Sequence, residues 1–142
     1  MDATASREPL WDRACHIQAQ MFEETVALGG LDVQLAYYRG FMEFSSTPWT
    51  RNAKDLLGHM TGLRCAAGHT QISRVLEHAR QETRRRSINA LVFVGDCMEE
   101  SVDELCQLAG VLGILGVPTF FFQEGGEPIA TCAFKQIARL TG

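Results

Sequence analysis

The sequence predicts an α/β protein with three layers: a mostly parallel central sheet with helices on both faces. Two continuous apolar runs, 88–94 and 117–122, are typical of strands that are buried on both sides. Helical patterns precede, separate and follow these runs, and this alternation is typical of parallel sheets covered by helices. A chain of 142 residues fits one domain, 1–142, because most domains contain about 100–200 residues.

The first predicted helix spans residues 9–28. Its apolar residues recur every three or four positions, which places them on one face of a helix. Ser6 precedes the pattern as a candidate N-cap, and Gly29–Gly30 ends it. The predicted buried stripe consists of Leu10, Ala14, Ile17 and Met21.

The other elements follow from the same two periodicities and from turn residues. Alternating apolar positions predict a strand, Arg39–Gly40 predicts a turn, and Ser45–Pro48 interrupts the pattern. Three arginines, 84–86, suit the negative C-terminal end of a helix. The predicted strands are 31–37, 41–44, 88–94 and 117–122, and the further helices are 52–60, 70–86, 101–115 and 132–140.

Composition and charge exclude several classes of protein. Thirteen Lys and Arg against 17 Asp and Glu give a net charge of −4, so we expect no nucleic-acid partner. The uncharged stretch 105–122 is interrupted by Gly116 and Pro118, which predicts a helix followed by a strand and no membrane span. The N-terminus lacks a secretory signal, and an odd count of five cysteines without a C-x-x-C pair fits a reducing cytoplasm.

Candidate functional residues carry hard oxygen donors. Asp96 directly follows an apolar strand, and Thr70 lies in a Gly-containing loop at a helix start. Asp2, Thr4 and Ser6 alternate, so an extended backbone would turn them to one side. Taken singly, each residue has an ordinary structural role open to it, such as a cap. Together they suit Mg²⁺, with Mn²⁺ or Ca²⁺ as alternatives, whereas the four scattered histidines disfavour zinc.

In this order, the segments Asp2–Ser6, Gly68–Ile72 and Val92–Asp96 resemble the von Willebrand factor type A domain family and its metal-ion-dependent adhesion site. The ending 134–142 is also similar to that family's last helix, so the resemblance covers nearly the whole chain. It implies a Rossmann-like, vWA-type fold for the single domain. It also implies a metal-dependent protein-interaction module and no enzyme.

The resemblance further implies a role for each matching residue. The hydroxyls of Thr4, Ser6 and Thr70 would bind the metal directly, and Asp2 and Asp96 would hold metal-bound waters or coordinate directly. A cation held mainly by neutral hydroxyls and water keeps much of its charge. A protein partner that presents an acidic side chain would then complete the coordination.

Two departures from the family pattern stand out. Only Met1 precedes Asp2, where the family has a hydrophobic central strand. We therefore expect that residues upstream belong to the natural product, since the alternative is a sheet that lacks its N-terminal central strand. Cys97 follows Asp96 where the family commonly has Gly, and a nucleophilic role for it would need an adjacent base.

Alternative functions remain open at this stage. A Mg²⁺-dependent phosphoryl-transfer or hydrolytic enzyme would use Asp2 as nucleophile and Asp96 on the metal, with Arg7 or Arg74 stabilising charge. A dinucleotide-binding role lacks the G-x-G-x-x-G pattern. A purely structural role without metal is the third alternative. The sequence predicts neither the oligomeric state nor whether Glu99 or Glu100 folds back onto the metal.

Overall fold

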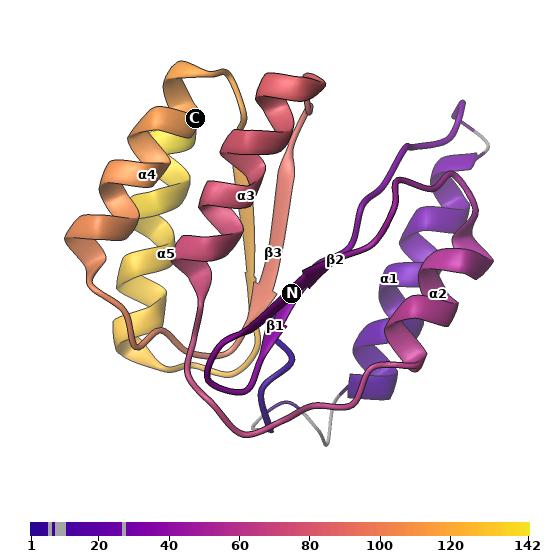
Figure 1. The fold of residues 1–142 in the computed structure, drawn as a ribbon, viewed down its shortest axis with the longest axis horizontal. Coiled ribbons are helices and arrows are strands. Elements are labelled where there is room, and N and C mark those ends of the chain that lie inside the picture. The colour runs from indigo at the N-terminus through magenta and orange to yellow at the C-terminus, as the bar shows by residue number, and fades with distance from the viewer. Residues whose placement is uncertain (6, 8–10, 27) are drawn as a thin grey trace. The chain divides into compact units, whose positions relative to one another are not determined.

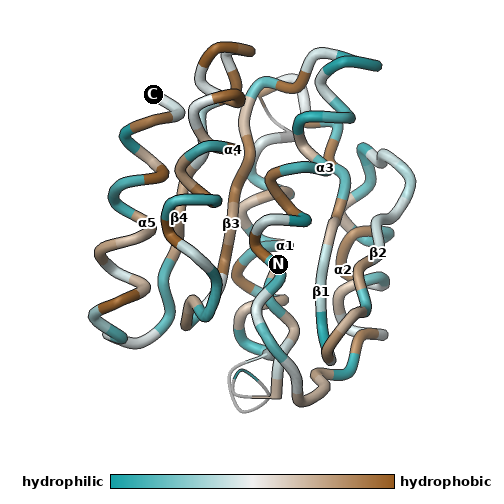
Figure 2. Tube along the Cα trace, turned by 60° about the vertical axis from the view of Figure 1, so that its left-hand side comes forward, coloured by the Kyte–Doolittle hydropathy of each residue, from teal (hydrophilic) through white to brown (hydrophobic). Residues whose placement is uncertain are grey.

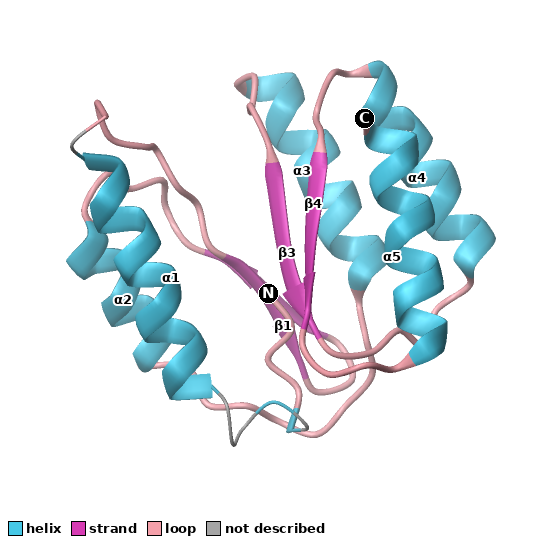
Figure 3. Ribbon diagram, turned by 180° about the vertical axis from the view of Figure 1, so that it is seen from behind, coloured by secondary structure: helices cyan, strands magenta, loops and turns pink. Residues whose placement is uncertain are grey.

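The structure, a computed structural model, describes residues 1–5, 7, 11–26 and 28–142. Within these residues the chain is mixed α/β, with five helices, one antiparallel pair of strands and one parallel pair (Figures 1 and 3). It forms two compact units. The N-terminal unit is Ala3–Gly68, and the C-terminal unit joins Met1–Asp2 to His69–Gly142. The prediction of an α/β protein is confirmed at this level.

The helices of the N-terminal unit are α1, Trp11–Val26, and α2, Ala53–Thr61, which pack against each other. The predicted stripe of α1 was only partly right: Ala14 is buried, whereas Ile17 and Met21 are 46 % and 54 % exposed. Leu10, the first residue of the stripe, lies outside the described residues. The large aromatic side chains determine which face of α1 is buried, and Trp11 also donates a hydrogen bond from Nε1 to the Met60 carbonyl, at 3.1 Å. The buried residues of α1 are Trp11, Ala14, Cys15, Ala19 and Phe22.

The same unit contains a β-hairpin of β1, Ala36–Arg39, and β2, Glu43–Ser46. Both strands begin later along the chain than the predicted strands 31–37 and 41–44. Arg39 lies opposite Glu43 in the register, and their side chains form an ion pair at 2.8 Å. Gly40 has φ +61°, a backbone conformation that glycine adopts without strain, so the turn falls on residues 40–42.

The C-terminal unit is built around a βαβ motif. Strand β3, Leu91–Gly95, leads through α4, Val102–Ile114, to the parallel strand β4, Thr119–Gln123. β3 is a continuous hydrophobic stretch of the tube in Figure 2, and its last three residues are buried. The prediction that 105–122 forms a helix followed by a strand is confirmed. Among the described residues, no helix combines the length and apolar character needed to cross a bilayer.

Helices α3, Ile72–Arg85, and α5, Pro128–Thr141, complete this unit, and α4 packs against both (Figure 1). Helix α5 begins four residues before the predicted start because Pro128 occupies its first turn and Glu127 caps it, accepting hydrogen bonds from two backbone N–H groups. The Phe93 and Phe121 rings of the two strands pack against Phe134 of α5, with centroids 5.5 and 4.8 Å away.

The prediction that these two strands are buried on both sides was wrong, because three side chains on the other face of β3 and β4 are about half exposed. Val92 and Phe120 lie opposite each other in the register and are each 53 % exposed, and Phe122 is 52 % exposed. Because side chains alternate along a strand, these residues lie on the face opposite to Phe93 and Phe121. Within this unit, the buried core therefore lies between the helices and the face of the strands that carries Phe93 and Phe121.

Candidate metal site

Asp2, Asp96 and Cys97 form a cluster in the C-terminal unit. One carboxylate oxygen from each aspartate and the Cys97 Sγ all lie within 4.8 Å of one another. The Asp2 side chain is fully buried, and those of Asp96 and Cys97 are partly buried. Two carboxylates this close repel each other in a poorly solvated position, and a cation between them removes that repulsion.

The backbone of β3 positions all three residues. Asp96 and Cys97 directly follow the last residue of the strand, and the Asp2 N–H donates a hydrogen bond of 3.0 Å to the Val94 carbonyl. Gly95 leaves room for Asp2: a Cβ at this glycine would lie 3.2 Å from the Asp2 Cβ and 2.7 Å from the Phe93 ring. A side chain at position 95 would therefore move the neighbours that hold the cluster together.

The Asp96 Oδ1 atom is buried and accepts no hydrogen bond from the described residues. A buried carboxylate oxygen without a donor is costly, because it gives up its hydration without a replacement. A cation bound at this atom would supply the missing interaction. The cluster therefore fits a divalent ion in three respects: the type of its donor atoms, their spacing, and a buried carboxylate oxygen without a hydrogen bond among the described residues.

Cys97 does not have the properties of a nucleophile. Burial raises the pKa of its thiol to about 12, and the carboxylates of Asp96, Asp2 and Glu99 add to the rise. A thiol with that pKa is almost entirely protonated at neutral pH, and the thiolate is the reactive form. The surrounding carboxylates thus disfavour a nucleophilic role for Cys97.

Thr70 is held against the loop that follows the cluster. Its buried hydroxyl accepts a hydrogen bond from the Glu99 N–H at 3.0 Å, and Glu99 lies three residues after Asp96. A hydroxyl oxygen has two lone pairs, so this bond leaves one for a second interaction. The loop before α3 is therefore directly joined to the loop after β3, which begins with Asp96 and Cys97.

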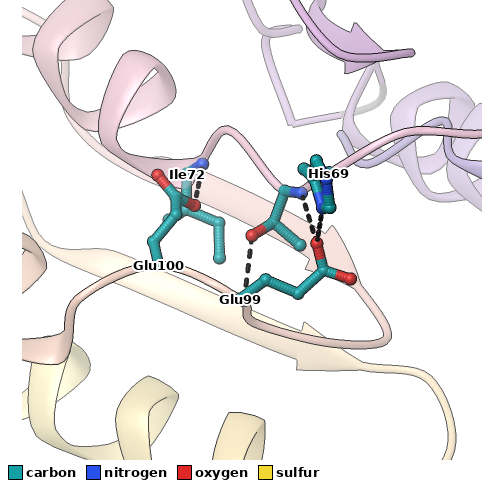
Figure 4. Close-up of polar contacts among 5 residues, drawn as sticks. His69, Ile72, Glu99 and Glu100 are labelled. Atoms are coloured by element: carbon teal, nitrogen blue, oxygen red, sulfur yellow. Dashed lines mark hydrogen bonds and ion pairs between the residues drawn. The ribbon is translucent and has the colours of Figure 1, made fainter.

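Glu99 and Glu100 make contacts with the loop before α3 (Figure 4). The Glu100 carboxylate accepts hydrogen bonds from the Ile72 N–H at 2.6 Å and the Ser73 N–H at 2.9 Å. It thereby caps α3, whose first turn contains no acidic residue and whose N-cap residue makes no capping bond. The Glu99 carboxylate pairs with His69 Nδ1 at 2.7 Å. Both carboxylates thus have partners at the start of α3.

The remaining two predicted ligands are Thr4 and Ser6. Thr4 is buried in the N-terminal unit, where it forms an isolated parallel bridge with Ala66. Ser6 lies outside the described residues, so its predicted roles as N-cap and as metal ligand stay predictions. The structure places Asp2, Asp96 and Thr70 in one unit and leaves the hydroxyls of Thr4 and Ser6 as expectations from the motif.

Sequence reasoning missed two features of this region. From the sequence, Cys97 is considered as a departure from the family pattern and as a nucleophile, but not as a ligand, although its position directly after Asp96 places it at the same end of the strand. The capping contact of Glu100 joins residues that are 28 positions apart, so no local pattern announces it. This contact and the Glu99–Thr70 hydrogen bond both join the loop after β3 to the start of α3.

Comparisons with known proteins add no relative: no protein-family model matches the chain, and no curated protein matches it significantly. The resemblance to the von Willebrand factor type A family therefore continues to rest on the residues of the three segments named above.

Proposed function

We propose that this chain is a metal-dependent protein-interaction module. It binds one divalent cation, Mg²⁺ in the first instance, through the carboxylates of Asp2 and Asp96 and the hydroxyl of Thr70. Hard oxygen donors of this kind suit Mg²⁺, which seldom uses more than two carboxylates and keeps several of its waters. Mn²⁺ and Ca²⁺ accept the same donors and are the alternatives.

The observation that carries the proposal is the cluster at the end of β3. Carboxylate oxygens of the two aspartates lie within 4.8 Å of each other, and Asp96 Oδ1 is buried without a hydrogen-bond donor among the described residues. Without a cation, the two carboxylates repel each other, and the buried Asp96 Oδ1 atom lacks a hydrogen bond from the described residues. With a cation, both costs are removed.

Partner binding follows from the coordination number. Mg²⁺ takes six ligands, and the donors supplied by Asp2, Asp96 and Thr70 leave positions that water fills. A carboxylate on a partner protein can replace one of these waters and bridge the two proteins through the ion. The proposed partner is therefore a protein that presents an exposed Asp or Glu side chain.

The finer fold assignment and the location in the cell belong to the same proposal. We assign the chain to the three-layer von Willebrand factor type A kind of fold. The parallel pair of β3 and β4, connected through α4, is compatible with this assignment. A reducing cytoplasm is supported by the five cysteines, all of which are free thiols.

The phosphoryl-transfer alternative is less well supported. It requires a cationic side chain near the metal to stabilise charge on a phosphate. The Arg7 side chain is buried and its guanidinium lies 5.2 Å from the centre of the Trp11 ring. Arg74 donates a hydrogen bond to Gln71 Oε1 at 2.9 Å. Both candidate arginines thus have other contacts in the fold.

Calorimetric titration of Mg²⁺ and Mn²⁺ tests the proposal. We expect one ion per chain in the unmodified protein and a loss of at least about tenfold in affinity in Asp96→Ala. The control is Asp103→Ala, which removes an exposed aspartate from the first turn of α4 in the same unit and should bind the ions as the unmodified protein does. Equal binding by all three proteins contradicts the proposal.

Two further assays distinguish the proposed interaction module from the alternative phosphoryl-transfer or hydrolytic enzyme. A glutamate-containing peptide should raise the apparent Mn²⁺ affinity of the unmodified protein but not of Asp96→Ala. Hydrolysis of p-nitrophenyl phosphate that depends on Mg²⁺ and is abolished in Asp2→Asn would favour the enzyme instead.

A further inference from the structure

We propose that Cys97, in place of the Thr70 hydroxyl, joins Asp2 and Asp96 as the third protein ligand when the site holds Zn²⁺ or Co²⁺. The site would then bind these sulfur-accepting cations more tightly than Mg²⁺. This inference rests on the proposed function, because it assumes that the cluster of Asp2, Asp96 and Cys97 binds a cation. It goes beyond the family resemblance, which implies oxygen ligands alone.

The spacing of the three donor atoms supports a common ion. Zinc binds sulfur at about 2.3 Å and carboxylate oxygen at about 2.0–2.2 Å in tetrahedral geometry, so two donors on one ion lie roughly 3.3–3.7 Å apart. The Cys97 Sγ and the nearest oxygens of Asp2 and Asp96 all lie within 4.8 Å of one another. Small side-chain rotations would bring all three donors into the coordination range.

The position of Cys97 on the backbone makes these rotations small. Cys97 is adjacent to Asp96, and both follow the last residue of β3. On the other side, the Asp2 N–H is bonded to the Val94 carbonyl at 3.0 Å, which fixes its backbone beside the same strand end. The three donors are therefore brought together by the sheet and do not depend on a mobile loop.

The mixture of donors determines which ions the site prefers. Carboxylates suit Mg²⁺, Ca²⁺ and Mn²⁺, whereas a thiolate selects softer ions such as Zn²⁺. Mg²⁺ would use the two carboxylates and leave the thiol protonated. Zn²⁺ or Co²⁺ would bind all three donors, and the Sγ proton would be released to solvent.

Three protein ligands also leave a position open. Closed structural zinc sites have four protein ligands, while sites with three keep a water or an external ligand in the fourth position. A partner's carboxylate would occupy this position as it would on Mg²⁺. The thiol therefore changes the choice of ion and keeps the proposed mode of partner binding.

Absorption spectroscopy of the Co²⁺-loaded protein tests the inference. A cysteine thiolate on Co²⁺ gives a sulfur-to-metal charge-transfer band in the near ultraviolet, which oxygen ligands do not give. We expect this band in the unmodified protein, its loss in Cys97→Ser, and its retention in the control Cys106→Ser. We also expect Cys97→Ser to lower Zn²⁺ affinity by at least about tenfold, because loss of an outer-shell partner alone costs 10–100-fold.

Mg²⁺ titration of the same proteins keeps the inference separate from the proposed function. Mg²⁺ affinity should be unchanged within about twofold in Cys97→Ser and in a second variant, Cys97→Ala, whose folding is checked by circular dichroism. Mg²⁺ binding without a Cys97-dependent band overturns the inference and leaves the proposed function intact. If neither Mg²⁺ nor Co²⁺ binds to the unmodified protein, both are overturned.

Discussion

The Glu99 backbone N–H donates a hydrogen bond of 3.0 Å to the Thr70 hydroxyl, and this contact joins the loop after β3 to the loop before α3. The two residues are 29 positions apart in the sequence. Thr70 is 5 % exposed, so the bond is shielded from competing water on the threonine side. The contact links the proposed metal ligand Thr70 to the segment that carries Asp96 and Cys97.

Replacement of Thr70 by valine keeps the shape of the side chain and removes the acceptor. We expect Thr70→Val to lower the free energy of unfolding by about 1–3 kcal/mol, because it removes the acceptor of a partly buried N–H. It should also weaken Mn²⁺ binding. Chemical denaturation and Mn²⁺ titration measure the two effects. Thr70→Ser retains the hydroxyl and serves as the control, so equal ion affinity in the two variants would argue against Thr70 as a ligand.

Two glycines of α4 provide a matched test of how this helix packs. A Cβ at Gly113 would come within van der Waals overlap of the Leu140 carbonyl oxygen of α5, whereas a Cβ at Gly110 would meet nothing within 4 Å. We expect Gly113→Ala to destabilise the protein by about 1–3 kcal/mol through this clash. Gly110→Ala should stabilise it by about 0.5–1 kcal/mol through helix propensity. Thermal unfolding of both variants measures the difference, and equal effects would contradict the observed α4–α5 contact.

The thiols should differ in reactivity. Burial raises the pKa of Cys15 to about 11 and that of Cys97 to about 12, whereas Cys132 is exposed. Since the thiolate reacts, we expect iodoacetamide at pH 8 to modify Cys132 faster than Cys15 or Cys97 by about two orders of magnitude. The rates at the slow thiols should rise about tenfold per pH unit above pH 8, because the thiolate fraction does so below the pKa. Peptide mass spectrometry measures each rate, and similar rates at all three would contradict the described burial.

The sequence predicted much of the C-terminal unit because its signals are local. The strand ending at Gly95 and the helix–strand order within 105–122 follow from apolar runs and from the breakers Gly116 and Pro118. The buried face of α1 was not predicted. Apolar spacing alone does not distinguish the Ile17–Met21 stripe from the one that includes Trp11 and Phe22, and tertiary packing against α2 decides between them.

In the candidate site, too, local features could be predicted from the sequence, whereas contacts between distant segments could not. The rule that functional residues gather beyond the carboxyl ends of strands placed Asp96 correctly at the edge of the sheet, and the structure brings the Asp2 carboxylate to it. The capping of α3 by Glu100 depends on a loop from another element, which periodicity does not encode. The position of Cys97 next to Asp96 is visible in the sequence, whereas the closeness of its thiol to the Asp2 carboxylate depends on the fold.

The central claim is that one divalent cation binds at the end of β3, and paramagnetic broadening by Mn²⁺ tests it most directly. In ¹H–¹⁵N spectra of the full chain at substoichiometric Mn²⁺, the account predicts that the amide signals of Asp2, Gly95 and Asp96 broaden first and that Mg²⁺ reverses the effect. If the earliest broadening instead occurs at the partly buried carboxylates of α3, Glu77 and Glu82, or nowhere, the proposed site is contradicted.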